Sequence, residues 1–331
     1  MIAYSYPGST EFLVGNVSEV STMRPSNEMA FDFVMAPFDQ SLSDTYWFKL
    51  SSLSSSRVFP SPSSFLAAEV ESTSRDEYDA AFKAIKKAIQ ADQLNKAVLS
   101  RRLKTPKADQ DLYHLFVNLK NQYPDAFTYL ISTPETGTWM GASPELVLSH
   151  KANKTVTTAI AGTQALTTSI DEVEWGEKEI QEHAFIEDYL KEALVANDID
   201  FNISTKSTIP AGDICHIHSR IEIKSHTNLS QLIEIIHPGP ALSGYPVKPA
   251  IKLIREIESN SRQFYCGYLG PISSKGIDWF ANIRCLQVHA QSFTLYIGGG
   301  ITADSNLDSE WEETNLKANT LLSILETANS I

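Results

Sequence analysis

Hydrophobic positions predict an amphipathic helix and then a strand in the first third of the chain. The apolar side chains that share one helical stripe between residues 74 and 90 are Tyr78, Ala81, Phe82, Ile85 and Ile89. Ser74 is suited to cap the start of this helix. The sequence KAVLSRR at 96–102 follows, and its side chains alternate between two faces, so that Lys96, Val98 and Ser100 share one face of a strand.

The rest of the chain predicts many short strands interrupted by a few helices. Helices are predicted near 111–122, 174–195 and 248–258, and after the turn at 304–306. Strands are predicted at 126–132, 138–149, 155–160, 202–209, 214–224, 263–272, 277–288 and 292–299, with a loop at Ala161-Gly162-Thr163. Consecutive strands with short turns favour antiparallel pairing over alternating βαβ units. We therefore expect an α+β fold of large antiparallel sheets, with helices packed on the outside.

The expected domain organisation is one domain over residues 1–331. Within it, residues 1–70 form a smaller N-terminal subregion and residues 71–331 the catalytic core. The serine-rich stretch at 51–64, which contains two prolines, predicts an exposed loop or linker near the boundary.

Composition and charge narrow the classes of partner. Hydrophobic residues make up 42% and charged residues 20% of the 331 residues, as in globular proteins. A net charge of −13 argues against nucleic acid or an anionic membrane surface as a partner. With no membrane-spanning run and no secretory leader pattern, we expect a cytoplasmic protein. Its three cysteines lack metal-site spacing and are expected to be reduced core residues.

The stretch IGGGITADSNLDSEWEETNLKA at 297–318 carries the first candidate chemistry. Its glycines, among them Gly298 and Gly300, permit positive φ and a close approach of backbone N–H groups to an anion. In the helix that follows, Glu310, Glu313 and Lys317 are spaced three and four apart and share one face. A solvated helix face with an internal ion pair explains that helix equally well.

A second acidic helix upstream favours a metal site. In the sequence EKEIQEH at 177–183, Glu179 and Glu182 fall on one stripe with His183. Two such helices facing one another would surround a divalent cation with carboxylate oxygens, the ligands that suit Mg²⁺. Glu145 is a further candidate, since Pro144 before it fixes its own φ, although a surface position is the common fate of glutamate.

Taken together, these segments resemble the chorismate-utilising enzymes, a family of isochorismate, anthranilate, aminodeoxychorismate and salicylate synthases. The resemblance runs from about Glu77 to Leu325. The matching motifs, in the family order, are KAVLSRR, GASPEL, AGT, EKEIQEH, HIHSRI, HPGPALSGYP, FYCGYLG, the strand around Arg284 and the glycine–acid stretch.

The resemblance implies a binding site for chorismate, a dianion. By similarity, Glu182 and Glu313 would bind Mg²⁺ directly, with Glu179 and Glu310 in or near the next layer, and the ion would bridge to one substrate carboxylate. The other carboxylate would meet Arg284, Tyr265 and backbone N–H groups at Gly298 and Gly300. The remaining residues expected at the substrate are Gly162, Thr163, His216, Ala241 and Lys317.

Structural roles for three of these residues stay open. Arg284 could form a structural ion pair, His216 could be a hydrogen-bonded core histidine, and Tyr265 could be ordinary packing. A His-x-His metal site at His216 and His218 is disfavoured, since Mg²⁺ prefers oxygen ligands.

Within the family, Lys96 favours isochorismate synthase. By resemblance it is the base that activates water for attack at C2, where anthranilate synthases typically carry glutamine, and Glu145 protonates the hydroxyl leaving C4. A lysine can serve as a base near neutral pH only if burial or neighbouring positive charge lowers its pKa. A salicylate synthase, an aminodeoxychorismate synthase-like enzyme and a non-catalytic binding homologue remain alternatives. A monomer is expected, and the downstream pathway, to menaquinone, a siderophore or salicylate, stays open.

Overall fold

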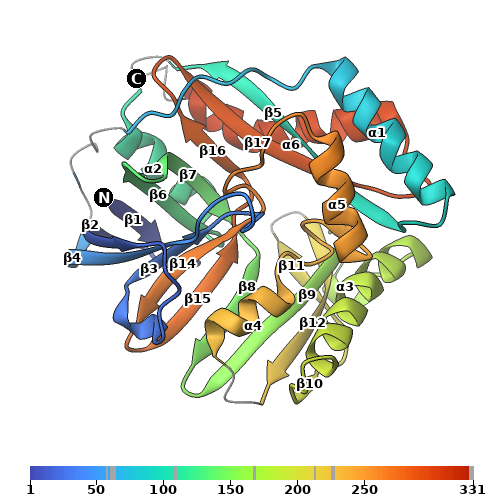
Figure 1. The fold of residues 1–331 in the computed structure, drawn as a ribbon, viewed down its shortest axis with the longest axis horizontal. Helices are drawn as coiled ribbons and strands as arrows, with labels where there is room; N and C mark the ends of the chain where they lie inside the picture. The colour runs from blue at the N-terminus through green and yellow to red at the C-terminus, as the bar shows by residue number, and fades with distance from the viewer. Residues whose placement is uncertain are drawn as a thin grey trace.

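In the computed structural model, the strands form one antiparallel hydrogen-bonded series that folds back on itself (Figure 1). The structure describes residues 1–56, 59, 65–107, 110–166, 169–211, 214–224 and 228–327. The first half of the series, in order of pairing, is β13 (Gly244–Tyr245), β5 (Lys96–Pro106), β17 (Ser292–Ile301), β16 (Cys285–Val288), β7 (Gly137–Ser143), β6 (Phe127–Thr133), β1 (Ile2–Ser5), β2 (Phe12–Ser21) and β4 (Tyr46–Ser56). The second half continues from β4 through β3 (Phe33–Ala36), β14 (Tyr268–Ser273), β15 (Gly276–Ala281), β8 (Leu146–Lys151), β9 (Lys154–Ala165) and β12 (Ile214–Ile223), which pairs with both β10 (Phe201–Ile203) and β11 (Ser207–Ala211).

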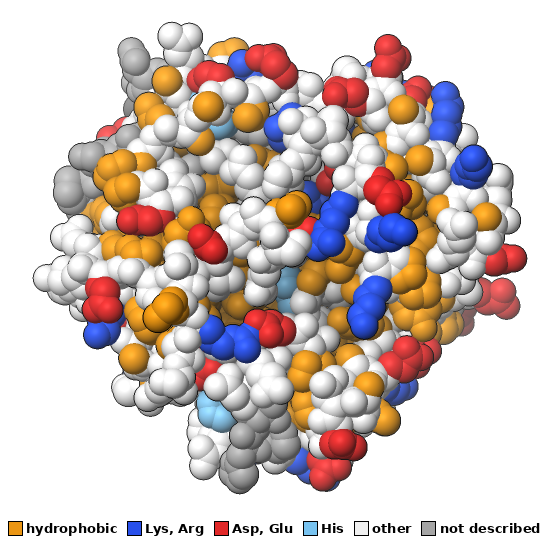
Figure 2. Space-filling view, in the orientation of Figure 1, with side chains coloured by type: hydrophobic (Ala, Val, Ile, Leu, Met, Phe, Trp, Pro, Cys, Tyr) orange, Lys and Arg blue, Asp and Glu red, His pale blue; other side chains and the backbone are white. Residues whose placement is uncertain are grey.

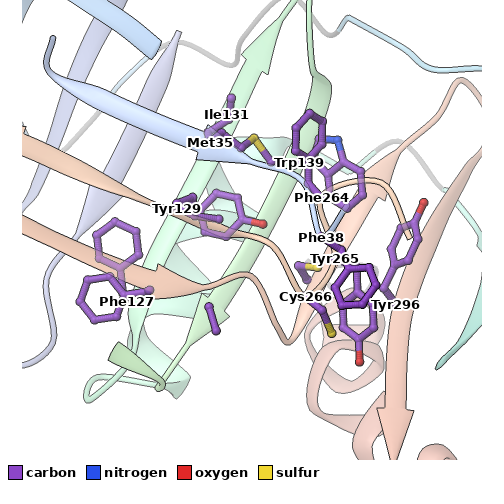
Figure 3. Close-up of a cluster of buried hydrophobic side chains, with 14 of the residues drawn as sticks. Met35, Phe38, Phe127, Tyr129, Ile131, Trp139, Phe264, Tyr265, Cys266 and Tyr296 are labelled. Carbon is purple, nitrogen blue, oxygen red and sulfur yellow. The ribbon is translucent and has the colours of Figure 1, made fainter. Parts of the chain in front are cut away.

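The two halves pack face to face around one aromatic core. Side chains from both halves meet there, among them Met35 from β3, Phe127 from β6 and Trp139 from β7 (Figure 3). The ring of Phe127 stacks on that of Phe280 of β15 at 4.4 Å between centroids. Alternate residues of an antiparallel strand point to one face, so one face of each half supplies this core and the other is left for helices.

Helices cover the outer faces, as predicted. They are α1 (Arg75–Gln90), α2 (Leu112–Gln122), α3 (Glu177–Val195), α4 (Leu229–Ile236), α5 (Val247–Ile257) and α6 (Leu307–Thr327), with short 3₁₀ turns at Glu28–Ala30 and Ile170–Glu172. Helices α2 and α6 pack on the first half, α3 and α4 on the second, and α1 and α5 beside β5. The α+β prediction is confirmed.

A local signal placed the start of α1 correctly, whereas α3 begins at Glu177 and not near the predicted residue 174. The Ser74 hydroxyl oxygen accepts a hydrogen bond from the N–H of Glu77, and the Glu77 carboxylate accepts one from the N–H of Ser74, so α1 begins with a capping box. The cysteines are buried and free, as predicted. Among the described residues, no helix is long and apolar enough to cross a membrane.

Several strand predictions are wrong in detail. The predicted strands at 202–209 and 277–288 are each two strands, β10 with β11 and β15 with β16, and the predicted strand at 263–272 begins only at Tyr268. The predicted strand at 138–149 is two strands, β7 and β8, because Pro144 interrupts the ladder before Glu145. The predicted loop at 161–163 lies inside β9, where Gly162, at φ +69°, is the extra residue of a bulge opposite β12. Glycine can adopt this φ without strain, so the strand continues through it.

The first 70 residues are woven into the sheet. Strand β1 pairs with β6, and β3 pairs with β14, so neighbours of these strands come from the middle and the end of the chain. Residues 51–56 of the predicted linker belong to β4, and most of its remainder, residues 57–58 and 60–64, lies outside the described residues. A boundary at residue 70 stays a prediction.

Candidate active site

A cavity of about 950 Å³ gathers most of the predicted site residues. It lies where β5 and β17 meet α3, α6 and the turn before β13. The predicted residues that line it are Lys96, Glu145, Glu179, Glu182, Ala241, Tyr265, Arg284, Gly298, Gly300, Glu310, Glu313 and Lys317. These residues come from eight segments of the chain, so only the folded sheet brings them together.

Lys96 begins β5 at the floor of this cavity. Its side chain is only 5% exposed, and its Nζ lies 2.5 Å from Oε1 of Glu182 on α3. Burial alone would raise the pKa of Glu182, but the charge and the hydrogen bond of Lys96 hold that pKa below its usual value. The proposed base and a proposed metal ligand are therefore partners of one another in this structure.

The glycine run is a strand and not a positive-φ loop, contrary to the prediction. Gly298 and Gly300 lie in β17, opposite Ser100 and Val98 of β5, and neither has positive φ. Glycine is needed there for space. A Cβ on Gly298 would lie 2.7 Å from the Tyr265 hydroxyl, and one on Gly300 would lie 2.6 Å from Cε of Lys96.

The N–H groups of these two glycines nevertheless turn away from β5. The N–H of Val98 donates to the carbonyl oxygen of Ser243, and the N–H of Ser100 donates to Oε1 of Glu258. The N–H groups of Val98 and Ser100 therefore point away from β17, and each residue belongs to a non-hydrogen-bonded pair of the β5–β17 ladder. Their partners Gly298 and Gly300 then face the opposite edge, beyond the last pair with β16. The expected N–H contact with an anion stays a prediction.

Glu145 occupies the break between β7 and β8. Its backbone is fixed, because its carbonyl accepts the N–H of Ala281 at 2.9 Å. Burial raises the pKa of Glu145 to about 7, although the charges of Lys96 and Arg284 act in the opposite direction. A carboxyl group of this kind holds a proton for part of the time at neutral pH, as a general acid must.

Arg284 presents a cation to the cavity from a constrained backbone. Its φ is +49°, which is uncommon for a residue with a side chain, and its carbonyl accepts the N–H of Ala142. Burial lowers the pKa of its guanidinium. Across the described chain this guanidinium has no hydrogen bond or ion pair, so the structural ion pair left open above is not found. An unpaired arginine in a cavity is suited to bind a carboxylate.

Tyr265 and Cys266 form the wall beside Arg284. The Tyr265 ring lies in the aromatic core and stacks on Tyr296, 5.8 Å between centroids, while its hydroxyl reaches Gly298 at the cavity (Figure 3). The packing role and the binding role of Tyr265 are therefore compatible. Cys266 is also at positive φ, and its carbonyl oxygen accepts a hydrogen bond from Nε2 of the His237 ring at 3.1 Å, which fixes this turn.

The four predicted metal ligands face the same cavity from α3 and α6. Lys317 lies 2.7 Å from Oε1 of Glu313, and Ser305 donates to Oε1 of Glu310 at 2.6 Å. Burial raises the pKa of Glu310, and the charge of Glu313 adds to that rise. Among the described side chains, no three His, Cys, Asp or Glu residues form a ready ligand group. The donor set is nonetheless all carboxylate oxygen, the chemistry that suits Mg²⁺.

Three predicted substrate residues lie outside the cavity lining. Gly162 is buried against α3, where a Cβ would lie 3.0 Å from Cβ of Glu179. The Nδ1 atom of His216 lies 3.0 Å from the Gly162 carbonyl oxygen. Thr163 pairs with His216 across β9 and β12, and its side chain lies outside the described part. Gly162 thus packs directly against α3, and His216 contacts the backbone of Gly162.

Several residues of the lining were missed from the sequence. Lys178, Phe185 and Cys266 line the cavity together with the predicted residues. Lys178 could have been found, because it precedes Glu182 by four positions on the same helix face. Phe185 stacks on Tyr245 of β13, a contact across 60 residues that no local pattern indicates.

Fold and site together define a chorismate-binding enzyme. The pattern of the family described as "chorismate binding enzyme" matches residues 37–323, and the chain belongs to this family.

Its relatives include isochorismate synthases. The chain is 30% identical over 246 residues to the isochorismate synthase EntC of Escherichia coli strain K12, which covers 70% of this chain and 62% of EntC. It is 32% identical over 252 residues to the isochorismate synthase DhbC of Bacillus subtilis, with 69% and 62% covered. The matched part thus spans less than two thirds of these relatives.

Solved structures share the fold. The menaquinone-specific isochorismate synthase MenF of Escherichia coli superposes with a TM-score of 0.82 at 16% identity, covering 98% of this chain and 88% of MenF. Anthranilate synthase component I of Streptococcus pneumoniae gives a TM-score of 0.72 at 18% identity, covering 90% and 82%.

Proposed function

We propose that the protein is an isochorismate synthase, an isomerase that converts chorismate reversibly into isochorismate. The observation that carries this proposal is that Lys96 and Glu145 line one cavity with Arg284, a cation that has no ion pair within the part of the chain that the structure describes. The names of the relatives support the same reaction class.

The proposed reaction divides two proton transfers between two side chains. Water adds at C2 of the ring, and Lys96 takes its proton. Glu145 gives a proton to the C4 hydroxyl, which departs as water while the ring double bonds shift, so the product is an isomer of the substrate. Lys96 can accept a proton only after its amine leaves the ion pair with Glu182. Arg284 would hold the carboxylate of the enolpyruvyl arm.

We propose Mg²⁺ as the cofactor, held by Glu182 and Glu313 with Glu179 and Glu310 beside them. When bound, it would neutralise the second substrate carboxylate. On the face drawn in Figure 2, acidic and basic side chains are interspersed. We further propose a cytoplasmic monomer, in keeping with the acidic composition and the free cysteines.

Product analysis tests the proposal. The protein is incubated with chorismate and MgCl₂, the products are separated by chromatography, and their masses are measured by mass spectrometry. We expect a new species with the mass of chorismate. A product that has lost pyruvate would indicate a salicylate synthase, and unchanged chorismate would indicate a binding homologue.

The variant Lys96→Ala should abolish turnover while chorismate still raises the melting temperature. Lys252→Ala, at an exposed position of α5, is the matched control and should keep wild-type turnover. Undiminished isomerisation by Lys96→Ala would show that another group is the base.

A further inference from the structure

A second and much smaller cavity lies beside the middle of β5, at Leu99 to Arg102. It has a volume of about 30 Å³, and it is bounded by β5, the start of α1 and the segment that follows α5. The polar side chains that line it include those of Thr73, Glu77, Arg102, Glu258, Ser261 and Arg262. Tyr296 is part of the wall of both cavities.

Arg102 is the unusual member of this lining. Arg102 is only 9% exposed, and its Nε is buried without a hydrogen-bond partner among the described residues. Within the described ranges, no carboxylate lies within ion-pair distance of its guanidinium. Guanidinium keeps its proton in proteins, so this position carries a buried positive charge without a direct counter-charge.

The neighbouring arginines show what a satisfied guanidinium looks like in this protein. Arg101 donates from Nε to Thr314 Oγ1 at 2.6 Å and lies 4.0 Å above the Trp311 ring. Arg262 forms two hydrogen bonds with Glu258, at 2.6 and 2.8 Å, and two more with backbone carbonyls. Within the described ranges, the guanidinium of Arg102 forms no such hydrogen bond or ring contact.

The carboxylates of the cavity are already used by other donors. Glu258 accepts from Arg262 and from the N–H of Ser100. Glu77 accepts the N–H and the hydroxyl of Ser74, which lower its pKa more than the charge of Arg102 does. Neither carboxylate forms an ion pair with Arg102 in the described part of the chain.

We propose that this cavity binds a small monovalent anion, of the size of chloride, which neutralises Arg102. A buried unpaired charge is costly, and an ion at this point would offset that cost. The cavity holds one or two water-sized particles and is too small for phosphate. Hydroxyl and amide groups of the rim, on Ser259 to Ser261, supply further donors.

The test compares chloride with a bulky anion at constant ionic strength. The melting temperature of the protein is measured while sodium gluconate is replaced by sodium chloride or sodium bromide. We expect a saturable rise of about 4 °C at a chloride concentration 100 times the dissociation constant. Arg102→Met should lose this rise, whereas Arg220→Met, at an exposed position of β12, should keep it.

A crystal grown in bromide provides an independent measurement on the wild-type protein. We expect an anomalous difference peak beside the Arg102 guanidinium. Equal melting temperatures in chloride and gluconate, or a chloride response that Arg102→Met retains, would overturn the proposal. If the variant does not fold, the absence of a bromide peak at Arg102 would do the same.

Discussion

Replacing Glu145 by glutamine should stabilise the protein at alkaline pH while it removes the proposed acid. The carboxyl has an ordinary pKa of 4.5 in the unfolded chain and a pKa of about 7 in the native state, because burial disfavours its charge. At pH 5 the native carboxyl is protonated, and glutamine resembles it in shape and charge. At pH 8.5 it is ionised, and the native state bears the cost of a desolvated carboxylate.

The magnitude follows from the difference between the two pKa values. A pKa raised from 4.5 to about 7 removes up to about 3 kcal/mol of native stability as the pH rises through this interval. The sign is the reverse of that for a salt-bridged carboxylate, since the native state here binds the proton more tightly. For a chain of this length, about 3 kcal/mol corresponds to roughly 4 °C in melting temperature.

Chemical and thermal denaturation at pH 5 and pH 8.5 measure the effect. We expect Glu145→Gln to melt with the wild type at pH 5 and about 4 °C above it at pH 8.5, and to lack isomerase activity at both. Glu256→Gln, at an exposed position of α5, controls for the loss of one carboxylate. A stability difference for Glu145→Gln that is the same at both pH values would refute a raised pKa at this site.

Three further changes test other contacts of the cavity. Arg284→Met should raise the KM for chorismate by about 100-fold, because one charge-assisted pair is lost; steady-state kinetics would show it, and an unchanged KM would exclude a carboxylate at this position. Gly300→Ala should lower turnover at least tenfold with little change in melting temperature, since the new methyl group must displace Lys96. Lys96→Met should raise the affinity for Mg²⁺ about tenfold in calorimetric titration without substrate, because it frees Glu182, and a weaker affinity would contradict that competition.

Local signals predicted the elements, and long-range packing decided what they do. The cap at Ser74 and the stripe after it lie within a few residues of one another, so the sequence displays them directly. The sequence explained the glycines at 298 and 300 by positive φ, and this explanation is wrong. Glycine is required at these positions because the side chains of Tyr265 and Lys96, from distant segments, leave no space for a Cβ. No local pattern indicates such a contact.

The ion pair between Lys96 and Glu182 was missed for the same reason. It joins residues 86 positions apart, and it exists only because the start of β5 lies beneath α3. The motifs identified both residues, but they indicated Lys96 as a base and Glu182 as a metal ligand and gave no sign that the two are in contact. The positive φ of Arg284 could not be predicted either, since side chains ordinarily exclude that conformation.

The charged side chains that line the cavity are arranged so that only part of the positive charge needed to bind a dianion is already available. Glu182 and Glu313 are each held by a lysine of the protein, so a divalent ion entering between α3 and α6 must replace those lysines. Arg284, which lines the same cavity, has no ion pair with any described residue and is available to a carboxylate at once. An acidic protein can therefore accept an acidic substrate, because Glu182 and Glu313 are already paired with lysines and the Arg284 guanidinium has no ion pair among the described residues.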